Sequence, residues 1–510
     1  MNQATGASSP ELVTSQASVG GWYGGVGILL AVILVAPIWA VEYPPLVDYP
    51  NHLARGFILY HFKDDSSFSE YLEIDYRPIP NLAIDFFLLA LQPFCDVRLA
   101  GKLFLTITLW LLLAGWHLLG CAIHGKPTWL ALGGALVAYH SMFLYGFANF
   151  SLGLGIFLVA FAAWLHWRDN WAWWRLLLVT ILALSCYFSH LSALIFLAGT
   201  ALAVTFWDTL QRRGITLTRI VGLAPVLLPF ALLFFCGGGG ASSEWNFPLK
   251  LVGALCMFLG YNRHIDAAFI AAVAVFLILL GVWSFRVRAN GGVLFAGLGC
   301  VFMFLVGPYQ VLGGSPADAR FLPPAAALIS VSLDLILPRK KALALLGLFV
   351  ALVVFRYATI GAYWLNFQSD LRDQVESFQS FPEHAKVYPM VNVPDQPEER
   401  KLGLASFHLI QYAVIDRQIY TPHLLAFAGQ QPIRYKTPPI AFHADAERFT
   451  DVADVDWNDW NKVFASYDYL WGWHLPDVYH HFLQRRCTLV AEKGNSTIWR
   501  VKLRPANSVK

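Results

Sequence analysis

Three side chains that could do acid–base chemistry lie within eight residues of one another, directly after the first long apolar segment. Asp48, His52 and Arg55 supply a carboxylate, an imidazole and a guanidinium. Ionisable groups so close to a bilayer are costly and usually have a function. A carboxylate at the membrane surface could take the proton from an attacking hydroxyl, which makes Asp48 the candidate catalytic base.

A structural role for the same residues stays open. Pro50 suits the first turn of a helix, so residues 49–62 are expected to form one. Asp48 would then precede that helix and could cap its free N–H groups, with Arg55 as an interface anchor. We stake the chemistry on Asp48. His52 and Arg55 are candidates for substrate binding or for the local scaffold.

Further candidates lie elsewhere in the chain. Asp85 falls midway along an apolar run at 80–93, where it could face water or bind sugar hydroxyls. Arg320 follows a Gly- and Pro-rich stretch, and its guanidinium could bind a phosphate or extend to the interface. Arg263 and His264, with Lys250, are weaker candidates for the phosphate.

The composition is that of a membrane protein. Of 510 residues, 57% are hydrophobic and only 14% are charged, against roughly 25% charged in soluble domains. The net charge of +3 is too small to suggest nucleic acid binding. No Cys/His spacing typical of metal sites occurs, so no cofactor is expected; a divalent metal remains possible but unsupported.

The elements that must position these side chains are mainly membrane helices. About eleven spans are expected, with a range of 10 to 13. They are 23–41, 99–121, 128–146, 149–167, 174–189, 191–208, 219–236, 266–285, 291–311, 322–337 and 341–364. With these spans, the loops expected in the cytoplasm are rich in Lys and Arg. This charge pattern makes 80–93 a surface helix and 247–260 an interfacial or re-entrant segment.

The spans divide the chain into three parts. Residues 1–22 are expected to be a disordered cytoplasmic tail, and 23–364 a transmembrane module with an outer loop at 42–98. Residues 365–510 should form a soluble α/β domain on the outer face. Strands are expected at 386–391 and 467–471, helices at 401–416 and 476–486, and a hairpin at 488–501.

Three short motifs resemble the GT-C superfamily of integral membrane glycosyltransferases of bacterial type. They are Val47-Asp48-Tyr49-Pro50, the proline-led helix that ends at Arg98-Leu99, and Ala319-Arg320-Phe321-Leu322-Pro323. The resemblance implies inverting transfer of a sugar from a polyprenyl-phosphate donor to a hydroxyl of a glycan, lipid or protein. It also implies a bacterial inner membrane location, with the C-terminal domain in the periplasm. Many members carry a second acidic residue beside the first, where this chain has Tyr49.

Three other functions stay open. A transporter or flippase of a lipid-linked saccharide predicts ionisable groups in helix middles, where this chain has almost none. A non-catalytic subunit of a surface-polysaccharide assembly system predicts that Asp48 and Arg320 point away from each other. A ligase or polymerase of surface glycans would share most of the same features.

Overall fold

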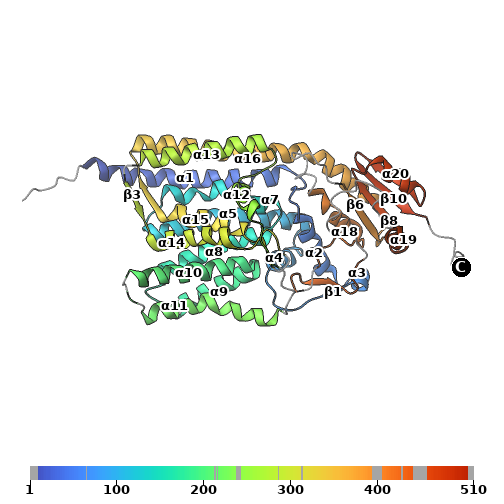
Figure 1. Ribbon diagram of the computed structural model, residues 1–510, viewed down its shortest axis with the longest axis horizontal. Helices are drawn as coiled ribbons and strands as arrows, with labels where there is room; N and C mark the ends of the chain where they lie inside the picture. Colours follow the sequence, from blue (N-terminus) through green and yellow to red (C-terminus); the bar gives the residue numbers. More distant parts are fainter. Residues whose placement is uncertain are drawn as a thin grey trace, which may run out of the picture.

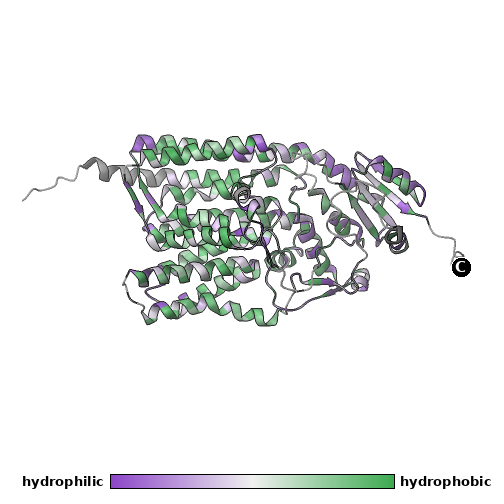
Figure 2. Ribbon diagram, viewed as in Figure 1, coloured by the Kyte–Doolittle hydropathy of each residue, from purple (hydrophilic) through white to green (hydrophobic). Residues whose placement is uncertain are grey.

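The protein is elongated, with a bundle of apolar helices at one end and a small sheet domain at the other (Figure 1). The computed structural model describes residues 10–64, 66–211, 214, 216–236, 243–284, 286–311, 314–392, 405–426, 429–439 and 457–502. Hydrophobic residues dominate the bundle, and hydrophilic residues become frequent toward the C-terminal domain (Figure 2).

Long helices form the bundle. They are α1 (Pro10–Ala40), α5 (Val97–His124), α8 (Ala148–Trp167), α9 (Trp173–Ser189), α10 (Leu191–Leu210), α11 (Leu217–Leu227), α13 (Arg263–Trp283), α14 (Gly291–Val306), α15 (Leu322–Ser332) and α16 (Arg339–Ser377). Shorter pieces join them: η1 (Trp129–Leu132), α6 (Gly134–Val137), α7 (Ser141–Leu144), η2 (Leu228–Phe235), α12 (Phe247–Cys256), η3 (Ala319–Phe321), and the strand pair β2 (Ser243–Glu244) and β4 (Gln310–Val311).

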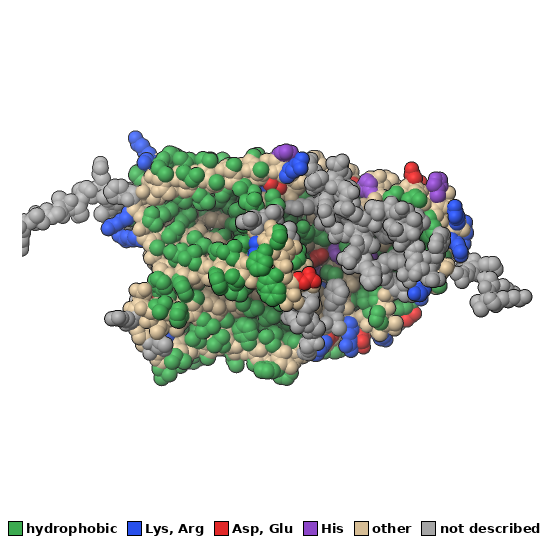
Figure 3. All heavy atoms as spheres, in the orientation of Figure 1, with side chains coloured by type: hydrophobic (Ala, Val, Ile, Leu, Met, Phe, Trp, Pro, Cys, Tyr) green, Lys and Arg blue, Asp and Glu red, His purple; other side chains and the backbone are tan. Residues whose placement is uncertain are grey.

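The described ranges contain seven helices long and apolar enough to cross a membrane, and four shorter apolar helical segments. Each of the eleven lies on one of the expected spans, so the polytopic helical architecture is confirmed. The apolar surface of the bundle fits an integral membrane protein (Figure 3).

Several boundaries differ from those expected. The helix α1 begins at Pro10, inside the expected tail, of which residues 1–9 lie outside the described ranges. The span expected at 128–146 is divided into η1, α6 and α7. The span expected at 322–337 ends at Ser332, and β5 (Leu333–Ile336) pairs antiparallel with β3 (Arg286–Ala289). Hydropathy alone cannot separate a short apolar strand from the end of a helix.

The expected domain boundary at 364 falls within a continuous helix. α16 runs on to Ser377 because the chain has no Gly or Pro between Gly361 and Pro382. The helix therefore leads directly from the bundle into the C-terminal domain, where η4 (Phe378–Ser380) follows it.

The C-terminal domain contains a four-stranded sheet in the order β6-β8-β10-β9. Its elements are β6 (Val387–Val391), α18 (Gln411–Arg417), β7 (Ile433–Tyr435), α19 (Trp457–Ser466), β8 (Tyr469–Trp473), α20 (Asp477–Gln484), β9 (Cys487–Lys493) and β10 (Ser496–Val501). β6 and β8 are parallel, and the other pairs are antiparallel. The expected strands, hairpin and last helix are confirmed; of the helix expected at 401–416, residues 401–404 lie outside the described ranges.

The outer loop is folded against this domain. It contains α2 (Tyr49–His61), α3 (Ser66–Tyr71), β1 (Leu72–Ile74) and α4 (Ala83–Leu91). β1 pairs antiparallel with β7, and Arg98 Nη2 at the start of α5 donates to both carboxylate oxygens of Asp416 at 2.6 and 2.7 Å. The loop and the C-terminal domain therefore lie together beside one end of the bundle.

Candidate functional site at the start of α2

Asp48 directly precedes α2, yet its carboxylate does not cap the helix. A capping residue usually has an extended backbone, which brings its side chain to the free N–H groups. Asp48 instead has helical backbone angles, φ −85° and ψ −8°, and its side chain makes no cap hydrogen bond. The carboxylate is therefore free of the structural task that the sequence left open.

A histidine of the C-terminal domain faces this carboxylate. His408 Nε2 lies 3.4 Å from Asp48 Oδ1, and the Asp48 side chain keeps 21% of its surface exposed. The group is thus held by the protein on one side and open to a substrate on another, as a general base requires.

The backbone of Asp48 is fixed by a turn of the bundle. Asp48 N–H donates to the Tyr145 carbonyl at 3.0 Å. Gly146, with φ +83°, lies so close that a Cβ there would be 2.6 Å from the Asp48 nitrogen. Only glycine fits both the backbone angle and the space. The turn at residues 145–147 therefore packs directly against the backbone of the residue that precedes α2.

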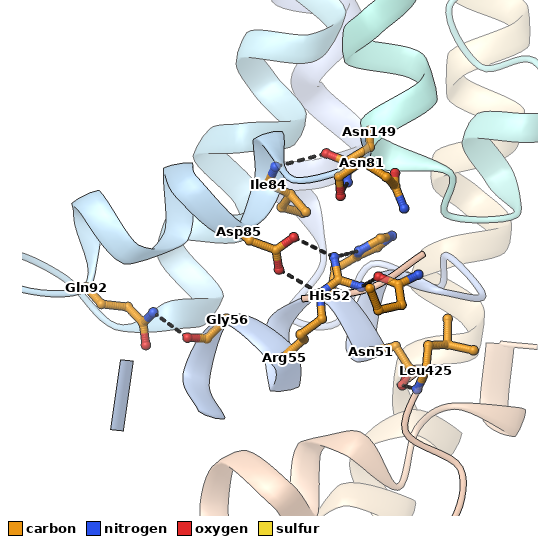
Figure 4. A network of polar contacts seen from close by, with 11 residues as sticks. Asn51, His52, Arg55, Gly56, Asn81, Ile84, Asp85, Gln92, Asn149 and Leu425 are labelled. Carbon is orange, nitrogen blue, oxygen red and sulfur yellow. Dashed lines mark hydrogen bonds and ion pairs between the residues drawn. The ribbon is translucent and has the colours of Figure 1, made fainter. Parts of the chain in front are cut away.

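His52, Arg55 and Asp85 form a buried network between α2 and α4 (Figure 4). Arg55 donates from Nε and Nη2 to the two oxygens of Asp85 at 2.6 and 2.8 Å. Its Nη2 also lies 3.0 Å from His52 Nδ1, and its Nη1 donates to Gln431 of the C-terminal domain. All the Arg55 nitrogens have partners, which makes the residue part of the scaffold.

Asp85 differs from both expectations for it. The side chain does not face water: Asp85 is 1% exposed, because α4 packs against α2, α5, α8 and α9. Both carboxylate oxygens are used by Arg55, which leaves them unavailable for sugar hydroxyls. Asn149 positions this helix by accepting from Ile84 N–H at 2.9 Å (Figure 4).

His52 is neutral in this network. Burial, reinforced by the Arg55 charge, lowers the pKa of His52 well below its ordinary value. Its ring is hydrogen-bonded to the backbone of Gly146, the same residue that packs against Asp48. The network therefore connects Asp85, through Arg55 and His52, to the turn that positions the candidate base.

Arg320 contacts the same turn. Its guanidinium carbon lies 5.5 Å from the centre of the Phe147 ring, and its charge acts on His190 at the start of α10. Its Nε is buried and has no hydrogen-bond partner among the described residues. Asp48 and Arg320 thus both border residues 145–147, and Arg320 retains donor capacity for a ligand.

The weaker candidates have different surroundings. Arg263 and His264 are exposed at the start of α13, where Arg263 Nε donates to His264 Nε2 at 3.3 Å. In the described part of the chain, no hydrogen bond or ion pair joins either one to Asp48 or Arg320. Lys250 is buried and forms an ion pair with Asp318 at 2.8 Å, so Asp318 already balances its charge.

An apolar cavity of about 520 Å³ lies along the bundle between α5, α13, α15 and α16. Its lining includes Val273, Phe276, Ile329 and Phe349, and it reaches Met257. Met257 also lines a small cavity beside His140 and Ala319, the neighbour of Arg320. The large cavity has the volume of a typical ligand pocket and leads toward the Arg320 region.

Sequence reasoning missed His408, Gln431 and Gly146. His408 and Gln431 lie far from α2 in the chain, and no local spacing connects them with it. Gly146 offered a weak signal, as a glycine between apparent spans. Among the described residues, no group of three or more His, Cys, Asp or Glu side chains could hold a metal ion.

Comparison with known proteins identifies the fold. No protein-family model matches the sequence, and no curated protein matches it. Among similar solved structures, the crystal structure of ArnT from Cupriavidus metallidurans in the apo state has a TM-score of 0.50 and 11% identity, covering 94% of this chain and 98% of that chain. ArnT bound to undecaprenyl phosphate aligns with a TM-score of 0.49, at the same identity and coverage. The GT-C-like fold implied by the sequence motifs is thereby confirmed over nearly the whole chain.

Proposed function

We propose that the protein is a membrane glycosyltransferase that moves a sugar from a polyprenyl-phosphate donor to an acceptor hydroxyl, with Asp48 as the base. The observation that carries this proposal is the Asp48 carboxylate, which is partly exposed and free of any capping bond at the start of α2. The GT-C-like fold supports the reaction class. The acceptor is a hydroxyl of a glycan, lipid or protein.

The donor would extend from the bilayer to the turn at residues 145–147. The cavity between α5, α13, α15 and α16 offers apolar walls for the isoprenoid chain. Arg320, with its unpartnered Nε, would bind the phosphate at the outer end. A donor bound in this way would have its sugar beside Asp48, with Asp85 and Arg55 as scaffold.

The transfer would be a single displacement with inversion. The acceptor oxygen attacks the anomeric carbon, and Asp48 takes the hydroxyl proton as the new carbon–oxygen bond forms. The bond between the anomeric carbon and the phosphate oxygen breaks on the opposite side. The lipid phosphate leaves as a stable anion, so no strong general acid is required, and Arg320 offsets the charge that develops on it.

The test is transfer by Asp48→Asn, which keeps the size of the side chain but removes its basicity. We expect kcat to fall by about 10²- to 10⁴-fold, the usual contribution of a general base. The assay uses the full chain in liposomes with radiolabelled undecaprenyl-phosphate hexoses and pentoses, and follows the label into a membrane glycolipid extract.

Asp64→Asn is the matched control, because Asp64 is exposed in the same outer loop. This variant should transfer at the wild-type rate. A folded Asp48→Asn protein that transfers sugar normally would rule out Asp48 as the base.

A further inference from the structure

The C-terminal domain brings one imidazole to the candidate base. His408 belongs to the segment that leads into α18, and its Nε2 lies 3.4 Å from Asp48 Oδ1. Nearby contacts hold this segment against α2: Asn51 Oδ1 accepts from Leu425 N–H at 3.0 Å, and Arg55 donates to Gln431. The His408 side chain is 10% exposed, so its place is set by packing and not by solvent.

Three other ionisable side chains lie around His408. His52 lies near it from α2, and His423, whose ring stacks on Phe407, lies near it in the C-terminal domain. Asp48 is the acidic side chain that contacts His408. The Nδ1 of His408 is buried without a partner among the described residues, so a proton there would gain no acceptor. Nε2, in contrast, faces Asp48 Oδ1 at 3.4 Å, so a ring proton there would lie toward the carboxylate.

We propose that His408 is a positioning residue that holds Asp48 Oδ1 and leaves Oδ2 to receive the acceptor proton. This inference rests on the proposed transferase function. In the step itself the His408 proton stays on Nε2. The acceptor proton moves to Asp48 as the new carbon–oxygen bond forms and the bond to the lipid phosphate breaks; Asp48 later releases that proton to water. The site is therefore complete only when the C-terminal domain is in place.

Two substitutions separate this role from simple packing. His408→Gln retains an N–H donor at the same distance along the side chain but loses the ring. His408→Phe retains the ring, which packs edge-on against Phe407, but has no donor. Positioning predicts an active Gln variant and an inactive Phe variant, whereas packing predicts the reverse.

The measurement is transfer from undecaprenyl-phosphate sugars by the full chain in liposomes. We expect His408→Gln to stay within about fivefold of wild type and His408→Phe to lose about 10²-fold in kcat, with the donor KM unchanged, because a misdirected base costs about that much.

Each other result contradicts the proposal. An active Phe variant or an inactive Gln variant would overturn it. If the Phe variant fails to insert, His408→Met removes the donor with a flexible apolar side chain and must show the same loss. Asp48→Asn is measured alongside: full activity there would contradict the transferase mechanism itself, whereas an inactive Asp48→Asn with an active His408→Phe would contradict only the role of His408.

Discussion

At the scale of single residues, the site contains a buried charge pair that does no chemistry of its own. Arg55 and Asp85 have side chains that are 0% and 2% exposed, and they bond to each other through two contacts. Removing two ions from water is costly, and only complete pairing makes their burial tolerable. The role of the pair is to orient His52, which in turn contacts Gly146 beside the backbone of Asp48.

Arg55→Met should therefore be much less stable than Arg55→Met combined with Asp85→Leu. The single variant leaves the Asp85 carboxylate buried without a cation, at a cost of about 3–5 kcal/mol, whereas the double variant replaces the pair by apolar groups and should recover most of that loss. Melting temperatures in detergent micelles are measured for Arg55→Met, Asp85→Leu and the double variant. Together they give the coupling between Arg55 and Asp85.

Arg55→Met and the double variant should both transfer sugar poorly, because neither retains the Arg55 guanidinium that contacts His52. If the double variant were as active as wild type, the network would have no part in positioning Asp48. Additive effects of the two substitutions on the melting temperature would argue against direct coupling of the pair.

At the scale of elements, the important feature is the contact between a turn of the bundle and the first residue before α2. Neither hydropathy nor helix propensity marks this contact, yet it combines a backbone hydrogen bond from Asp48 to Tyr145 with the close approach of Gly146. The same turn carries Phe147, which contacts Arg320. A small change in this turn should therefore affect both the proposed base, Asp48, and the proposed phosphate-binding residue, Arg320.

We expect Gly146→Ala to reduce transfer by about 10²-fold, because its Cβ would displace Asp48 from the reacting atoms. Gly125→Ala is the matched control: Gly125 has a similar φ of +67°, but nothing lies within 4 Å of the added Cβ. Both alanines have the same unfavourable backbone angle, so a difference between them reports the contact with Asp48. Equal activities in the liposome assay would show that this contact is unimportant.

At the scale of the whole molecule, charge is distributed unequally between the two ends. On the face shown in Figure 3, the end of the bundle remote from the C-terminal domain carries Lys and Arg, whereas the C-terminal end carries both signs of charge. In the middle of α16, Arg356 is paired with Asp266 on α13 at 2.7 Å and is buried. A paired, buried charge of this kind does not line a transport path, which weakens the transporter alternative.

The charge distribution predicts that the basic end lies in the cytoplasm and the C-terminal domain outside. Lys341→Cys and Val478→Cys place a thiol at exposed positions on the two ends. In intact bacterial cells, a membrane-impermeant maleimide should label the cysteine at 478 and leave that at 341 unlabelled, relative to the unsubstituted chain. Labelling of position 341 alone would reverse the orientation and place Asp48 on the cytoplasmic side.

The amino-acid sequence was sufficient for the features that depend on neighbouring residues. Runs of apolar residues located all eleven helical segments, and alternating apolar residues with turns located the strands of the C-terminal sheet. Pro50 located α2 and with it Asp48. These features are local, because the free energy of burying an apolar segment depends mainly on its own composition.

Only the tertiary structure decided which charged side chains form ion pairs with each other and which remain free. The sequence offered Asp85 and Arg55 as candidates for substrate binding, but they are bonded together. Among the described residues, the ion-pair contact of the Asp48 carboxylate is with His408 from the distant C-terminal domain. Ion pairs form between side chains that folding brings within a few ångströms, and no local pattern encodes that approach. The role of a charged residue in this protein was therefore determined by its partner and not by its position in the chain.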